Sequence, residues 1–289
     1  MGGGRGRHVT AVLLALASAA AYGLSDFVGG VTSKRASPWS VALVAAWVGG
    51  LALLGLSALV GGDPTRPDLG WALVAGVANG VGTGFLYRGL SSGRMGVVAP
   101  VSGVGAAVVP VAVGVLTGER PSALVWVGIL VALPGIWLVA REPVAEDVTG
   151  AAPSSSGALD GVLAGLGFGA LFAALAQIQE EAGFLPLALN QLVAGLVVVA
   201  MATALRARWL PREPAAALGG ISGVLGATAT GCFLLATQAG YLTVTSILAS
   251  LYPAITVVLA ATVLREHVHR TQAVGLVLCG AAVALVAGG

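Results

Sequence analysis

Residues 93–140 decide the fold, and they read GRMGVVAPVSGVGAAVVPVAVGVLTGERPSALVWVGILVALPGIWLVA. Two long apolar runs are separated by a short charged break at Glu119 and Arg120. The same plan returns over residues 240–287, at an offset of 147 residues (240 minus 93), with Glu266 in the place of Glu119. This stretch therefore predicts an internal repeat built from membrane-spanning segments.

The repeat extends backwards in the same register without a gap. It aligns Thr83 with Thr230 and Gly76 with Gly223. Matches among Ala, Val, Leu and Gly are expected by chance in this composition, so the Glu and Thr pairs carry most of the weight. Each half of the chain is interpreted as a copy of the other.

The composition identifies lipid as the solvent. The chain is 57% hydrophobic and 9% charged, with a mean hydropathy of +0.96, whereas a soluble domain has about a quarter charged residues. The net charge of +2 is small and dispersed, which gives no support for nucleic-acid binding. We therefore expect a multi-pass membrane protein that contacts lipid and binds no nucleic acid.

A membrane-spanning helix needs about 20 mostly apolar residues. The N-terminal segment, with Arg5, Arg7 and His8 before an apolar run, resembles a secretory signal, but the many later spans favour a retained first helix. The predicted all-α fold has a first repeat at 9–140, a polar linker at 141–157 and a second repeat at 158–288. The ten predicted spans are 9–30, 38–60, 69–90, 95–117, 122–140, 158–178, 184–205, 214–237, 243–264 and 270–288.

Five spans in each half have a topological consequence. Because five is odd, the second half must enter the membrane in the opposite orientation to the first. Two such halves form an inverted repeat, an architecture of secondary transporters whose substrate site lies near the bilayer midplane between the repeats. Lys and Arg are more numerous in the loops on the side opposite the termini, which by the positive-inside rule places both termini outside.

Motifs for other activities are missing from the sequence. Lys34 follows Ser33, so no phosphate-binding G-x-x-x-x-G-K-[ST] loop can form, which excludes primary pumping by this chain alone. Cys232 and Cys279 lie inside apolar runs, which argues against a disulfide framework or a thiolate metal site. His267 and His269 share one loop and are interpreted as solvated. We expect neither an enzyme nor a bound metal or cofactor.

Polar residues inside spans are costly in lipid, so they are the default candidates for a transport path. Asn79, Thr83 and Tyr87 follow one another at i, i+4 and i+8 and share a helix face. The alternative for each is an interhelical hydrogen bond that only supports the structure. Amides also occur at Asn190 and Gln191 in the seventh span. The candidate substrate-binding residues are Tyr22, Asp26, Asn79, Thr83, Tyr87, Ser102, Gln177, Thr230, Ser246, Ser250 and Tyr252.

Three acidic residues need separate interpretation. Asp26 is the one acid that falls within a predicted span, and three roles remain open: a proton-coupling carboxylate, a salt-bridge partner of Lys34 or Arg88, or an interfacial residue. Glu119 and Glu266 lie at helix ends before Arg120 or His267, where structural pairing at the membrane boundary is favoured over contact with substrate.

The repeat resembles a known domain. Residues 87–139 resemble the end of an EamA domain, and residues 240–285 resemble a second one, most closely over SLYPAITVVLAATVLRE at 250–266. Such domains are the repeats of the drug/metabolite transporter superfamily. Two departures stand out, since the second span lacks an arginine often found there and REH replaces GER after the ninth span.

The resemblance implies ten spans, an inverted repeat and a central cavity lined by spans 1, 3, 4, 6, 8 and 9. It also implies cytoplasmic termini, against the count of loop charges. The resulting hypothesis is a secondary transporter in the inner or plasma membrane of a bacterial-type cell that exports a small metabolite, amino acid or drug-like compound. The proton is an open candidate as coupling ion. The alternatives are an uptake or facilitated-diffusion carrier for a sugar-like solute and a membrane scaffold that transports nothing.

Overall fold

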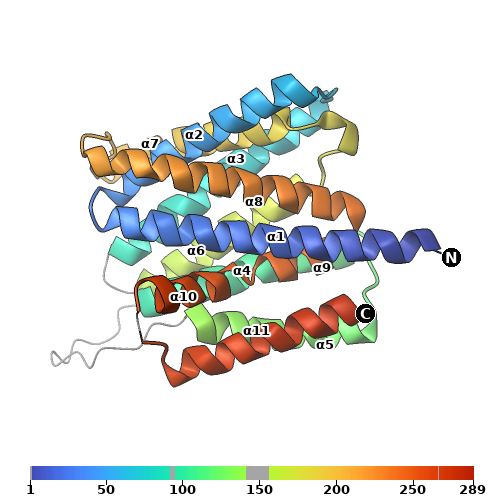
Figure 1. The fold of residues 1–289 in the computed structure, drawn as a ribbon. Helices are drawn as coiled ribbons and strands as arrows, with labels where there is room; N and C mark the ends of the chain where they lie inside the picture. The colour runs from blue at the N-terminus through green and yellow to red at the C-terminus, as the bar shows by residue number, and fades with distance from the viewer. Residues whose placement is uncertain (1, 92–94, 141–155, 266) are drawn as a thin grey trace.

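The computed structural model describes residues 2–91, 95–140, 156–265 and 267–289, which form a helical bundle (Figure 1). No strand occurs in these ranges, and both chain ends lie at the same end of the bundle. The first half contains α1 (Gly2–Ser33), α2 (Pro38–Val60), α3 (Arg66–Ser91), α4 (Met95–Leu116) and α5 (Ala123–Ala140). The second contains α6 (Ser156–Leu175), α7 (Leu185–Ala204), α8 (Gly219–Ala239), α9 (Leu242–Ala249), α10 (Tyr252–Val263) and α11 (Arg270–Gly288), with short 3-10 helices η1 (Glu180–Ala182) and η2 (Pro214–Leu218).

The prediction of ten spans is confirmed. In the described ranges, eight segments are long and apolar enough to cross a membrane, counting α9 and α10 together, and two shorter apolar segments, Val101–Leu116 and Leu159–Leu175, complete the ten. The helices that contain these two segments have 22 and 20 residues, which is long enough to cross a bilayer. The chain is therefore an all-helical, multi-pass membrane protein.

The ninth span differs from its prediction as one continuous helix. It breaks after Ala249 into α9 and α10, with Ser250 and Leu251 between them. Pro253 follows the break at the start of α10. Proline has no N–H to donate, and its ring clashes with the carbonyl four residues earlier, here that of Ala249. The helix tightens at this point, where the Leu251 N–H donates to the carbonyl of Leu248 instead of that of Ile247.

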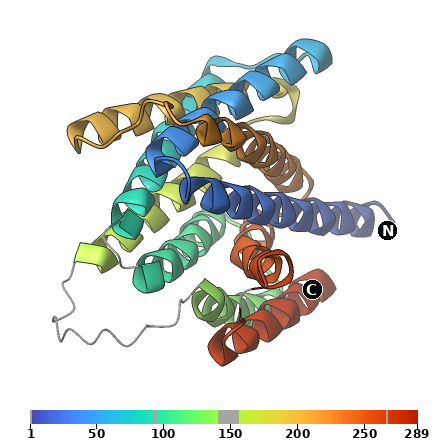
Figure 2. The same ribbon diagram turned by 60° about the vertical axis from the view of Figure 1, so that its left-hand side comes forward.

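The packing of the helices is the same when the two halves are exchanged. This exchange replaces α1 by α6, α2 by α7, α3 by α8, α4 by α9–α10, and α5 by α11. The contact of α1 with α8 then becomes that of α6 with α3, and the contact of α2 with α8 becomes that of α7 with α3. The contact of α4 with α6 becomes that of α9–α10 with α1, while the pairs α2–α7 and α5–α11 map onto themselves. These two self-paired contacts lie on opposite sides of the bundle, with α1, α4 and α6 between them (Figures 1 and 2).

The α5–α11 contact shows this symmetry at single residues. A Cβ added to Gly128 of α5 would lie 2.6 Å from Cγ2 of Val286, and one added to Gly275 of α11 would lie 2.6 Å from the backbone N of Val139. Gly128 and Gly275 are related by the repeat offset of 147 residues, and so are Val139 and Val286. The two halves therefore meet through the same contact made twice in opposite directions, as in a two-fold symmetric dimer.

Glu119 links the two halves at the end of the bundle that carries the termini. Its carboxylate accepts hydrogen bonds from the backbone N–H groups of Leu242 at 2.6 Å and Thr243 at 2.9 Å. These are the first residues of α9, whose N–H groups have no partner within the helix. Glu119 thus joins the α4–α5 loop of the first half to a helix of the second, and its partner is a helix terminus rather than a cation. Glu266, its counterpart in the repeat, lies outside the described residues.

The close approach at Gly275 can be tested against a second glycine of the same helix. Gly275→Ala should destabilise the protein by about 1–3 kcal/mol, because the new methyl group overlaps the backbone of α5. Gly280→Ala is the control, since a Cβ added there meets nothing within 4 Å. Thermal unfolding in detergent should show a lower midpoint for the first variant and an unchanged or higher one for the second. Equal midpoints would contradict the packing described for Gly275.

The hydrogen bonds of Glu119 give a second expectation. Glu119→Ala removes both acceptors from the start of α9 and should lower the free energy of unfolding by about 1–2 kcal/mol. Glu119→Gln keeps one side-chain oxygen and should fall between this variant and the wild type. Glu180→Ala is the control, because Glu180 is exposed and the structure gives its carboxylate no hydrogen bond. Equal losses of unfolding free energy in Glu180→Ala and Glu119→Ala would show that the two hydrogen bonds from Glu119 to the start of α9 contribute nothing.

Candidate functional site

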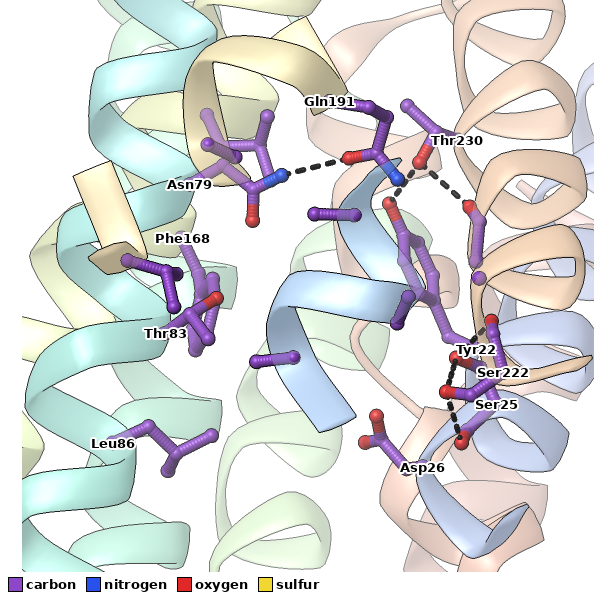
Figure 3. Close-up of a pocket in the computed structure, with 18 of the residues that line it drawn as sticks. Tyr22, Ser25, Asp26, Asn79, Thr83, Leu86, Phe168, Gln191, Ser222 and Thr230 are labelled. Carbon is purple, nitrogen blue, oxygen red and sulfur yellow. Dashed lines mark hydrogen bonds between the residues drawn. The ribbon is translucent and has the colours of Figure 1, made fainter. Parts of the chain in front are cut away.

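A cavity of about 190 Å³ lies between the two halves of the protein. Its walls come from α1, α2, α3 and α4 of the first half and from α6, α7, α8 and α10 of the second (Figure 3). It is large enough for several water molecules or a small organic solute. The lining residues are Tyr22, Ser25, Asp26, Ala42, Ala45, Ala46, Asn79, Thr83, Leu86, Ala106, Phe168, Leu171, Phe172, Gln191, Ala194, Val198, Ser222, Gly223, Gly226, Thr230 and Tyr252.

The cavity lies nearer to the face of the bundle opposite the chain termini. It takes residues 22–26 from α1, near the end of that helix, and residues 42–46 from α2, near its beginning. These helix ends meet on the face away from the termini. On the termini side lies α9, in which all eight residues are buried. The site is therefore asymmetric with respect to the membrane, although the fold is nearly symmetric.

Asp26 is the acidic residue of this lining. Its side chain is exposed to the cavity, and the structure gives it no hydrogen bond or ion pair with another described residue. Figure 3 shows it across the cavity from Thr83 and Leu86. A carboxylate within a membrane-spanning helix is costly unless it is paired or hydrated. The Asp26 carboxylate is therefore accessible from the cavity to a proton or a cationic group.

Arg88, one of the two salt-bridge partners considered for Asp26, pairs elsewhere. Its Nε donates to Oδ1 of Asp160 at 3.0 Å, and its guanidinium lies 4.6 Å from the centre of the Phe85 ring. Asp160 is buried at the beginning of α6, so this ion pair joins α3 of the first half to α6 of the second. It lies at the face toward which the cavity is displaced.

Aromatic rings form one wall of the cavity. The Tyr22 ring lies 6.0 Å from Phe172 and 6.1 Å from Tyr252, between ring centres, and is tilted by 58° and 55° relative to them. The Tyr22 hydroxyl makes a 3.0 Å hydrogen bond with Oγ1 of Thr230, which fixes the ring. Tyr22 lies one helical turn before Asp26 on α1, so the ring and the carboxylate share a face of that helix.

Two further polar contacts join the halves at this cavity, in addition to the Tyr22–Thr230 hydrogen bond. Ser25 Oγ donates to the carbonyl of Ser222 at 2.8 Å, Ser222 Oγ donates to the carbonyl of Ser25 at 2.9 Å, and so α1 is tied to α8. Asn79 Nδ2 donates to Oε1 of Gln191 at 3.0 Å, which ties α3 to α7. Each of these pairs consists of one residue from each repeat, so both pairs hold the two halves together at the cavity.

The lining can be compared with the residues selected from the sequence. Tyr22, Asp26, Asn79, Thr83, Thr230 and Tyr252 lie together in the cavity wall. The other candidates are placed elsewhere. Ser102 donates to the carbonyl of Ala99, and Ser246 donates to that of Thr243. Ser250 is buried without a partner for its hydroxyl, and Gln177 is exposed beyond the end of α6. The side chain of Tyr87 lies outside the described residues.

The structure also brings in lining residues that the sequence reasoning did not select. Ser25, Ser222 and Gln191 contribute polar groups, and Phe168 and Phe172 contribute rings. The resemblance implied walls from spans 1, 3, 4, 6, 8 and 9, and the structure adds α2 and α7. Gln191 carried a usable signal, an amide in an apolar span, whereas nothing in the sequence distinguishes Ser25 or Ser222 from other small residues.

Comparisons with known proteins agree with this architecture. The chain matches the EamA-like transporter family twice, over residues 9–141 and 155–288. A solved structure described only as "Crystal structure of protein" superposes with a TM-score of 0.71 over 95% of each chain at 14% sequence identity, which establishes a shared fold alone. No curated protein matches the chain. Because the two family matches cover almost the whole chain, it belongs to the EamA-like transporter family of the drug/metabolite transporter superfamily, a family of membrane transporters.

Proposed function

We propose that this protein is a secondary transporter that exports a small solute by alternating access. One observation carries the proposal: a cavity with polar side chains lies between two inverted repeats, which is where transporters of this architecture bind their solutes. The solute is a small metabolite, amino acid or drug-like compound, taken up on the cytoplasmic side of the inner or plasma membrane of a bacterial-type cell. The residues that contact it are those of the cavity wall, with Asp26 among them.

The difference between α4 and α9–α10 suggests how the cavity opens alternately to the two sides of the membrane. In the repeat register Ser250 corresponds to Gly103 and Tyr252 to Gly105, so the break in the ninth span corresponds to a glycine-containing segment of α4. That helix runs unbroken from Met95 to Leu116. In the opposite state the halves exchange conformations: α4 bends at Gly103–Gly105, where glycine tolerates the change, and α9–α10 straightens. The cavity is then displaced toward the face with the termini.

Asp26 is the proposed coupling group. It is an ionisable residue without a protein partner in the described structure, and it lies in the cavity. In the ionised form, the Asp26 carboxylate binds either a proton or the solute. The protein changes between its two states most readily when the proton or the solute neutralises this carboxylate, because an unpaired carboxylate is costly in the membrane. Exchange of proton for solute therefore follows from competition for a single carboxylate.

Flux measurements with Asp26→Asn test the transport function and this coupling. Proteoliposomes are screened with candidate solutes, amino acids and organic cations among them, with and without a pH gradient. Wild-type protein should show gradient-driven accumulation, and the variant should lose it by at least tenfold because it cannot exchange a proton. Asp63→Asn, which changes an exposed loop acid, should leave flux unchanged. Flux that ignores both the gradient and the Asp26 variant would leave a carrier without proton coupling, and no flux for any solute would favour a scaffold.

The break in the ninth span gives a second test. Pro253→Ala restores an N–H to the helix and removes the ring clash with the Ala249 carbonyl, so α9–α10 should straighten more readily. The populations of the two states should shift, and flux should fall several-fold without loss of folded protein. Pro214→Ala, in the short helix η2, is the control. Unchanged flux in Pro253→Ala would contradict a role for this break in alternating access.

A further inference from the structure

We infer that the cavity selects organic monocations with an apolar or aromatic body and discriminates against solutes that carry a carboxylate. The inference rests on the proposed function, because it assigns the solute class of the same cavity. It narrows the range of small metabolites, amino acids and drug-like compounds to amines and quaternary ammonium compounds.

The charge of the cavity lining favours a cationic solute. Asp26 is an acidic lining residue, and no described lining residue is Lys, Arg or His. Of the two cations considered as partners of Asp26, Arg88 is bound to Asp160, and Lys34, which follows α1, is not among the lining residues. The described wall therefore carries a formal charge of −1. A cationic solute neutralises this charge, whereas an anion adds to it in a medium that screens charges poorly.

The cavity wall that carries Asp26 also carries aromatic rings. A cation bound to Asp26 lies next to Tyr22, which is one helical turn away on the same face of α1. Phe172 and Tyr252 flank the Tyr22 ring, with ring centres 6.0 and 6.1 Å away, so three rings lie together in the cavity wall that carries Asp26. Aromatic faces attract ammonium groups within about 6 Å of the ring centre, and the attraction grows when water is excluded.

The far side of the cavity carries no described charge. Asn79 and Gln191 are neutral amides bonded to each other, and the remaining wall there consists of the Thr83 hydroxyl and the apolar side chains of Leu86, Ala194 and Val198. This region suits a hydrocarbon or aromatic body, with at most a hydroxyl. A second charged group such as the carboxylate of an amino acid finds no described cation there, and a buried charge without a partner is strongly disfavoured.

Matched pairs of probes test the inference directly. Tyramine is compared with tyrosine, and phenethylamine with phenylalanine, so that the members of each pair differ by one carboxylate. Trimethylphenylammonium carries a permanent charge and no N–H, and it shows whether charge alone suffices. Binding is measured by the rise of the thermal unfolding midpoint of the purified protein, which depends on ligand concentration and affinity and not on transport. The amines and the quaternary cation should bind at least tenfold more tightly than the amino acids.

Variants connect the selectivity to the named residues. Asp26→Asn should weaken amine binding at least tenfold, while Asp63→Asn should leave it unchanged. Tyr252→Leu removes a ring and should weaken binding of trimethylphenylammonium by roughly 3- to 30-fold. Tyr252→Phe keeps the ring and should restore most of it. Each variant is compared with wild type for its midpoint without ligand, so that loss of binding is separated from loss of folding.

The outcomes separate this inference from the proposed function. Amine binding without flux in proteoliposomes would support the assigned solute class and overturn transport. Flux or binding of amino acids or anions in preference to amines would overturn the solute class and leave transport standing. Equal binding of the members of each pair, or amine binding that survives Asp26→Asn, would overturn the inference.

Discussion

The fold depends on how closely the helix backbones of the two halves approach one another. In lipid no hydrophobic force drives helices together, so association relies on contact between small residues and on interhelical hydrogen bonds. Gly223 of α8 lies against the Ala45 carbonyl of α2, and Gly105 of α4 lies against Gly165 of α6. A side chain at any of these glycines would separate two helices from different repeats.

The same small residues leave the space for the cavity. The lining includes Ala42, Ala45 and Ala46 of α2 and Gly223 and Gly226 of α8. Their short side chains permit close packing where the backbones touch and leave unfilled volume where the helices diverge. Polar groups at this volume mostly satisfy one another, as Ser25 does with Ser222 and Asn79 with Gln191. Asp26 differs from them because its carboxylate faces the cavity without a described partner, and this contrast separates groups that hold the bundle together from one that is available for a solute.

Much of the fold could be predicted from the sequence, because each span is an apolar run bounded by charged and turn-forming residues. The repeat was visible for a similar reason, since Glu and Thr are rare enough in this composition for aligned pairs to be informative. The break in the ninth span was not predicted. Pro253 is plain in the sequence, but membrane helices often tolerate proline, and only the packing of neighbouring helices decides between a kink and a break.

The candidate site was harder to predict. Helices that are apolar all round give little indication of which face meets which neighbour, so a polar residue can be assigned to a span but not to a wall. Gln177 and Gln191 illustrate this limit. Both are amides in predicted spans, Gln177 near the end of the sixth and Gln191 inside the seventh. The structure ends α6 at Leu175 and leaves Gln177 exposed outside it, whereas Gln191 faces the cavity. The predicted span ended at residue 178, and this error of three residues in a helix end was enough to place one amide outside the helix.

The doubled contact between α5 and α11 bears on how such a chain can arise. Gly128 contacts Val286, and Gly275 contacts Val139. Each half therefore carries one glycine and one valine of this interface, and the valine of each half packs against the glycine of the other. A five-span protein with one such half would be self-complementary, provided that some molecules entered the membrane upside down relative to the others. Pairing of two oppositely inserted copies would build this interface from one gene, and fusion of two gene copies would then fix one orientation for each. The two halves would afterwards be free to diverge. Asp26 in the first span corresponds to Ala173 in the sixth, and a pair of identical subunits cannot have such a difference.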